Sequence, residues 1–132
     1  MEGAFAILKV IEQQKHSKEL CFEGCLALWN GTEGSSFIHK EICKEGKMEV
    51  LLSVLEKYKD EKNILLFCCL TIGVILSSDG TYNEFKKDNK KGLDKVLRAV
   101  EECYENNKRN KDIEEIYRVL KEEEDKSVKD TV

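Results

Sequence analysis

The sequence predicts an all-α protein built from a unit that occurs about three times. Proline is absent and glycine is sparse among the 132 residues, whereas charged residues make up 36%. This composition favours helices joined by short connections. Apolar residues recur at helical spacing, and three segments that each begin at a glycine share one apolar pattern.

The first shared element is a helix that starts close to a glycine. Gly3, Gly46 and Gly92 are separated by 43 and 46 residues. This spacing places one apolar stripe on each predicted helix. Four, five and eight positions after each glycine stand the residues Ile7, Leu8 and Ile11, then Val50, Leu51 and Val54, then Val96, Leu97 and Val100.

A polar break follows each of these segments, and a second helix is predicted after it. The second helix of the middle unit contains residues 64–76, which carry no charge. Its core positions align with those of the other two units. The matching sets are Cys21, Leu65 and Ile113, then Gly24, Cys68 and Ile116, then Leu28, Ile72 and Leu120.

Shorter helices are predicted between the units, at residues 35–45 and 80–91. Each of them leads to a glycine, Gly46 or Gly92. Glycine accepts the backbone angles of tight turns. We therefore expect a sharp turn between two helices at both glycines.

The unit of short helix, glycine turn and two longer helices resembles the armadillo repeat, and residues 24–32 (GCLALWNGT) are the best local match. The resemblance covers nearly the whole chain and implies a right-handed αα superhelix. It places a repeat domain at 1–126, with units near 3–45, 46–91 and 92–126, and a flexible tail at 127–132. A HEAT-like solenoid is the close alternative, and a plain helical bundle is the next.

The resemblance implies a concave groove lined by the last helix of each unit. In import receptors of this family, a tryptophan and an asparagine four residues later hold an extended peptide. Here those paired positions are Leu26 and Asn30, then Leu70 and Val74, then Arg118 and Glu122. Only Asn30 matches, so the resemblance does not imply a nuclear-import receptor.

Apart from Asn30, apolar side chains occupy these paired positions in the first two units. This apolar groove predicts a non-catalytic scaffold that binds an extended peptide or a helix of another protein. If Leu70 faces this groove, Leu70→Glu is expected to abolish binding and leave the protein folded. The alternative is that these residues are simply buried. The predicted partner-binding residues are Phe22, Leu26, Trp29, Asn30, Leu66, Leu70, Val74 and Arg118.

Other functions find little support in the sequence. The thirteen uncharged residues 64–76 are shorter than the ~20 that cross a bilayer as a helix. The cysteines at 21 and 25 and the pair His39 and Cys43 have helical spacing, but the cysteines align with apolar core positions, which disfavours zinc. No catalytic motif, cofactor motif or secretory signal is visible. The net charge of −4 argues against general nucleic-acid binding.

Two further expectations concern the setting of the domain. Three repeats leave apolar ends, which implies either self-association or flanking repeats. The chain is expected to be intracellular, in the cytoplasm or the nucleus, with reduced cysteines. The alternative function is a helical domain that binds a small molecule or lipid on the same apolar face.

Overall fold

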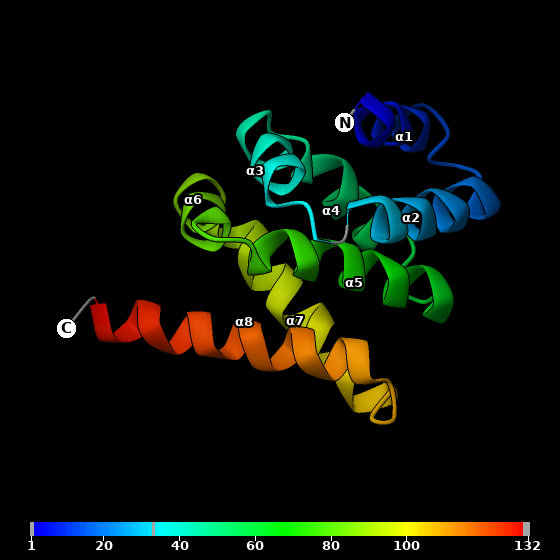
Figure 1. Ribbon diagram of the computed structural model, residues 1–132. Coiled ribbons are helices and arrows are strands. Elements are labelled where there is room, and N and C mark those ends of the chain that lie inside the picture. Colours follow the sequence, from blue (N-terminus) through cyan, green and yellow to red (C-terminus); the bar gives the residue numbers. More distant parts are fainter. Residues whose placement is uncertain (1, 33, 131–132) are drawn as a thin grey trace.

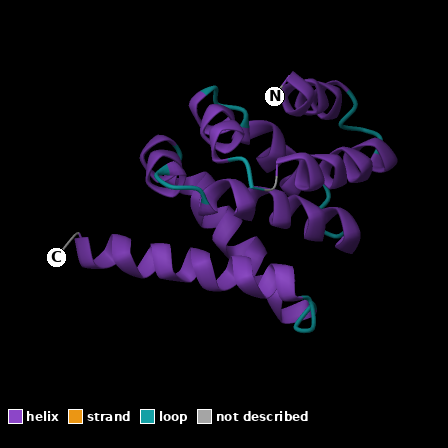
Figure 2. Cartoon of the chain, viewed as in Figure 1, coloured by secondary structure: helices purple, strands orange, loops and turns teal. Residues whose placement is uncertain are grey.

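The computed structural model describes residues 2–32 and 34–130, and in this part of the chain all regular structure is helical (Figure 2). The all-α prediction is therefore confirmed. The helices in these residues are α1 (Glu2–Gln13), α2 (Lys18–Thr32), α3 (Ser36–Lys44), α4 (Met48–Lys57), α5 (Lys62–Ser77), α6 (Thr81–Asp88), α7 (Lys90–Asn106) and α8 (Lys111–Asp130).

Helices that lie three places apart in the chain contact one another. α2 contacts α5 and α5 contacts α8, and these three lie one beneath the other in Figure 1. In the same way α1 contacts α4, α4 contacts α7, and α3 contacts α6. The repeated sequence pattern is thus accompanied by a repeated pattern of helix contacts.

The two glycines that were expected to form turns behave differently. Gly46 has a φ of 70° between α3 and α4, which is the left-handed turn that favours glycine. Gly92 lies inside α7, so the expected turn at this residue is wrong. The chain reverses instead at Asn89, whose side chain accepts a hydrogen bond of 2.9 Å from the Gly92 N–H and caps α7.

Gly92 is glycine for a different reason. A Cβ atom at this position would lie 2.6 Å from Asn89 Nδ2 and 2.9 Å from Leu52 Cδ1. The residue therefore allows the cap and helix α4 to approach α7 closely.

α5 is the central helix, and its position explains the long uncharged stretch at 64–76. It contacts α2, α3, α4, α6, α7 and α8. A helix with neighbours on most sides must be apolar on most sides. Thr71 is one polar exception, and its hydroxyl donates to the Cys25 carbonyl of α2 at 3.1 Å.

All six cysteines are buried and free, and they act as small apolar core residues. The Cys69 and Cys103 sulfur atoms lie 3.5 Å apart between α5 and α7. The carboxy-terminal helix α8 continues to Asp130, into the segment predicted to be a flexible tail. Residues 131 and 132 lie outside the described part of the chain.

Candidate interaction surface

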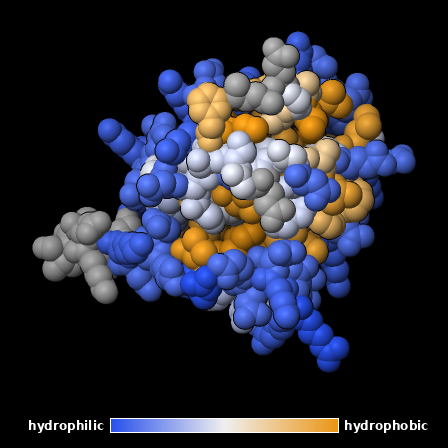
Figure 3. All heavy atoms as spheres, in the orientation of Figure 1, coloured by the Kyte–Doolittle hydropathy of each residue, from blue (hydrophilic) through white to orange (hydrophobic). Residues whose placement is uncertain are grey.

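Six large apolar side chains of α2 and α5 are half-buried, and together we call them the apolar strip. Each is partly exposed, and all except Leu26 also pack against the core. Figure 3 shows apolar atoms on the face that α2, α5 and α8 present, interspersed with near-neutral atoms and with hydrophilic atoms to the left and below. The apolar strip consists of Phe22, Leu26, Trp29, Leu66, Phe67 and Val74.

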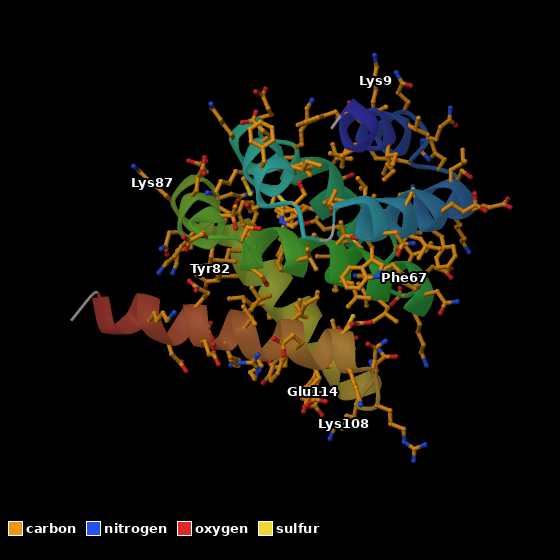
Figure 4. The ribbon with its side chains drawn as sticks, viewed as in Figure 1. Lys9, Phe67, Tyr82, Lys87, Lys108 and Glu114 are labelled. Atoms are coloured by element: carbon orange, nitrogen blue, oxygen red, sulfur yellow. The ribbon has the colours of Figure 1, made fainter. Side chains whose placement is uncertain are left out.

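An aromatic contact joins the two halves of the apolar strip. The rings of Phe22 and Phe67 meet edge to face, with centroids 5.5 Å apart and planes at 80°. Figure 4 shows Phe67 beside the junction of α2 and α5. Aromatic pairs in this geometry hold one another in place, so this part of the surface is preorganised.

Phe67 was missing from the residues predicted to bind a partner. The repeat alignment places the groove at Leu66, Leu70 and Val74, which are spaced by one helical turn. In the structure, the residues of 64–76 that reach solvent are Leu66, Phe67 and Val74. The available sequence signal was an aromatic residue next to a predicted groove position.

Leu70 is a core residue and not part of the apolar strip. Its exposed fraction is only 2%, although it lies between Leu66 and Val74 along the helix. The expectation that Leu70 contacts a partner directly is therefore corrected. For Leu70 the alternative interpretation holds: this residue is buried against neighbouring helices.

The polar residues predicted for the same face lie in water. Asn30 is exposed on α2, and Arg118 is exposed on α8. The Arg118 guanidinium binds Glu115 at 2.5 Å and Glu122 at 2.8 Å on its own helix. Figure 4 shows Glu114, one turn before Arg118, on the side of α8 that points away from α5. The structure thus brings together the apolar residues of the prediction and leaves Arg118 in an ion-pair network on α8.

The amino-terminal ends of α2 and α5 border the apolar strip and carry charges of both signs. Lys18 of α2 binds Glu61, the residue before α5, at 2.7 Å. The hydrogen bond that the Lys18 ammonium donates to Glu61 raises the pKa of Lys18 above its ordinary value. An open hollow of about 710 Å³ lies here, lined by Lys18, Glu19, Phe22, Asp60, Glu61, Lys62, Asn63 and Ile64.

The residues considered for zinc or thiol chemistry are buried in the core. Burial raises the pKa of Cys43 to about 12, which keeps this thiol protonated and unreactive. His39 is 3% exposed, and its Nδ1 lies 2.5 Å from Ser78 Oγ while its Nε2 has no hydrogen-bond partner. In the described residues, no three His, Cys, Asp or Glu side chains gather as metal ligands would.

Within the described residues, no single helix has both the length and the apolar character of a bilayer span. α5 and α6 have the length and the apolar character of a bilayer span only when they are taken together, and the angle between their axes is 108°. What the surface offers chemically is apolar contact area with charges at its border.

Comparison with protein-family models, curated protein sequences and solved structures gives no match for this chain.

Proposed function

We propose that the chain forms a short solenoid of armadillo type, with a right-handed superhelix of about three units. The rows of contacts α1–α4–α7, α2–α5–α8 and α3–α6 support this proposal, because stacked repeats place equivalent helices side by side. With units near 3–45, 46–91 and 92–126, the first contains α1 to α3, the second α4 to α6, and the third α7 and α8.

We infer that this domain is a non-catalytic module that binds a segment of another protein on the apolar strip. The observation that carries the inference is the partial exposure of large apolar side chains on α2 and α5, most of which also pack against the core. A partner that covers these side chains would remove apolar area from water without ordering a flexible loop, which keeps the entropic cost low.

A protein segment suits this surface better than a lipid or another small apolar molecule. Pockets for small molecules are concave and mostly apolar. The hollow beside Phe22 is open, and charged residues provide most of its lining. An elongated partner can instead place apolar anchors on the strip and polar groups near Lys18 and Glu61.

The test uses a displayed library of random peptides and helices, selected on the purified chain. Leu26→Glu and Phe67→Glu are expected to weaken binding of the selected peptides at least about tenfold, because a charge within the contact must lose its water. Lys108→Gln changes the net charge by the same amount at the α7–α8 turn, where Figure 4 shows Lys108 pointing into solvent. This control is expected to bind like the unmodified chain.

Circular dichroism must show unchanged helicity in all three variants, so that loss of binding is not loss of fold. Peptides that bind equally to both strip variants would show that the strip is not the site. A lipid found by native mass spectrometry on the unmodified chain, and absent from Phe67→Glu, would favour the small-molecule function instead.

A further inference from the structure

Helices α1 and α2 leave a second apolar surface uncovered, at the amino-terminal end of the helix rows. Val10 of α1 is 46% exposed and Leu20 of α2 is 39% exposed. The other exposed residues of this surface are glycines and alanines. We call this surface the end face, and it consists of Gly3, Ala6, Ile7 and Val10 of α1 with Leu20, Ala27 and Gly31 of α2.

The end face is continuous across the two helices and lies apart from the apolar strip. A hollow of about 160 Å³ joins α1 to α2, and both Gly3 and Ile7 line it together with Ala27 and Gly31. On α2, helical spacing places Leu20, Ala27 and Gly31 on the side opposite to Phe22 and Trp29, which belong to the apolar strip. The two surfaces are therefore on different sides of α2.

The small residues of the end face are not required by packing within the chain. A Cβ atom added at Gly3 or Gly31 would meet no other atom within 4 Å, whereas one added at Gly24 would lie 2.6 Å from Ile11 Cγ1. Gly24 is thus explained by the contact between α1 and α2. Gly3 and Gly31 leave open space at the surface, where another helix can approach closely.

We propose that the end face binds the end face of a second copy of this chain, in a two-fold symmetric dimer. The centre of the face carries no charge, so two identical faces meet without repulsion. Its rim carries Lys9 on α1, which Figure 4 shows projecting from the molecule, and the exposed Glu23 on α2. Laying α1 of one copy across α2 of the other brings Lys9 and Glu23 of different copies to the same edge.

The other end of the molecule does not suit the end face as a partner. The hollow between α7 and α8 is lined by Asp94, Arg98, Glu101, Lys121 and Glu124, among apolar residues. Covering these charges with an uncharged surface would remove their water without supplying partners. Contact between like ends, which closes at two copies, is therefore favoured over a head-to-tail chain.

The size of the end face sets the expected strength of the dimer. At about 1.5 Å of rise per residue and about 10 Å of width per helix, α1 and α2 present a face of roughly 20 Å by 20 Å. This footprint is roughly 400 Å² from each copy, which is small for a specific interface. We expect a dissociation constant in the micromolar range.

The experiment is sedimentation equilibrium of the whole chain, from low micromolar to millimolar concentration. The average mass is expected to rise from 15.2 kDa toward twice this value and then to level off. Val10→Glu and Gly31→Gln, both at exposed positions, are expected to weaken association at least about tenfold. Lys87→Ala, which matches Val10→Glu in charge change and lies on α6 away from α1, is expected to dimerise normally (Figure 4).

Three results would overturn the proposal. The first is a mass near 15.2 kDa at every concentration. The second is a mass that keeps rising beyond the dimer, which would indicate head-to-tail association. The third is dimerisation that is equally strong in Val10→Glu and Gly31→Gln, with circular dichroism showing that both variants are folded.

Discussion

The two ends of the molecule are built from equivalent helices but present opposite surfaces to water. At the amino-terminal end, α1 and α2 expose Val10 and Leu20 among glycine and alanine. At the carboxy-terminal end, α7 and α8 surround their hollow with charged side chains. Among the described residues, the most exposed large apolar side chains lie on α1, α2 and α3, and none lies on α7 or α8.

This difference shows that the shared sequence pattern determines which residues of a helix are buried, but not which residues lie on its outer side. Val96 and Leu120 are buried like Leu8 and Leu28, so both ends attach to the centre in the same way. In the described residues, the carboxy-terminal end has a charged outer side and the amino-terminal end has an apolar one. The following predictions test this comparison from the core outward.

The largest effect is expected where an apolar position of the central helix α5 belongs to the core. Leu70→Glu places a carboxylate at a site that is 2% exposed and should lower the free energy of unfolding by at least about 4 kcal/mol. Leu26→Glu, on the partly exposed strip, should cost less than about 1 kcal/mol. Urea unfolding followed by circular dichroism measures both, and similar losses in the two variants would refute the division between core and strip.

A smaller effect is expected at two glycines that lie in close contacts between helices, Gly73 between α5 and α8 and Gly24 between α2 and α1. A Cβ at Gly73 would lie 2.2 Å from Ile116 Cγ2 and 3.2 Å from Ile116 Cβ, so α5 and α8 must separate. Gly73→Ala should therefore cost about 2 kcal/mol of unfolding free energy. At Gly24 the added Cβ would lie 2.6 Å from Ile11 Cγ1, a less severe overlap than at Gly73, so Gly24→Ala should cost about half as much.

Gly31→Ala is the matched control for these two variants, because no atom lies within 4 Å of the added Cβ. It should leave the unfolding free energy unchanged or raise it slightly, since alanine is the better helix former. Chemical denaturation of the three variants at one dilute protein concentration gives the ranking. Equal losses at Gly73 and Gly31 would contradict the close contact between α5 and α8.

A pH effect is expected at His39, which connects the start of α3 to the end of α5. Burial lowers the pKa of His39 below its ordinary value of 6.5, so the unfolded chain takes up the proton first. Stability from the neutral ring is therefore fully present above pH 6.5 and is lost as the pH falls through the lower folded pKa. The thermal midpoint should fall on acidification from neutral pH.

Asparagine at this position can still bond Ser78 but does not titrate. His39→Asn should therefore lose less stability than the unmodified chain over the same pH range. His16→Asn, the same substitution at an exposed position, is the control. Parallel profiles for the unmodified chain and His39→Asn would show that His39 does not sense pH.

The smallest effect is expected for the exposed ion pairs on the surface of α8. Arg118→Ala removes two ion pairs, to Glu115 and Glu122, that lie in water. Exposed pairs of this kind contribute little because water and salt screen them. Differential scanning calorimetry should show no measurable shift of the midpoint, and a clear decrease would mean that this network holds the carboxy-terminal end together.

The sequence allowed the helical class and most core positions to be predicted, because the apolar period appears in three segments. Ile11, Val54 and Val100 are all buried, as their shared register predicts. The role of Gly92 could not be predicted, since it depends on the cap from Asn89 and on contact with Leu52. A repeat alignment gives the helix register but not the local chemistry of each turn.

The candidate surface was predicted only in part for a related reason. Helical spacing groups Leu66, Leu70 and Val74, yet packing from neighbouring helices covers Leu70 and leaves Phe67 open. The difference is set by how six helices crowd around α5, which no local pattern records. Leu26 and Trp29, which were predicted to bind a partner, are partly exposed because α2 has fewer neighbouring helices than α5.

The aromatic residues give the two ends separate optical signals. The single tryptophan, Trp29, packs on the core beside α5, so its fluorescence reports on the amino-terminal units. Tyr104 and Tyr117 stack at 4.5 Å between α7 and α8 and contribute a near-ultraviolet dichroism signal from the carboxy-terminal unit. Following both signals through one denaturation would show whether the ends unfold together, without any label being attached.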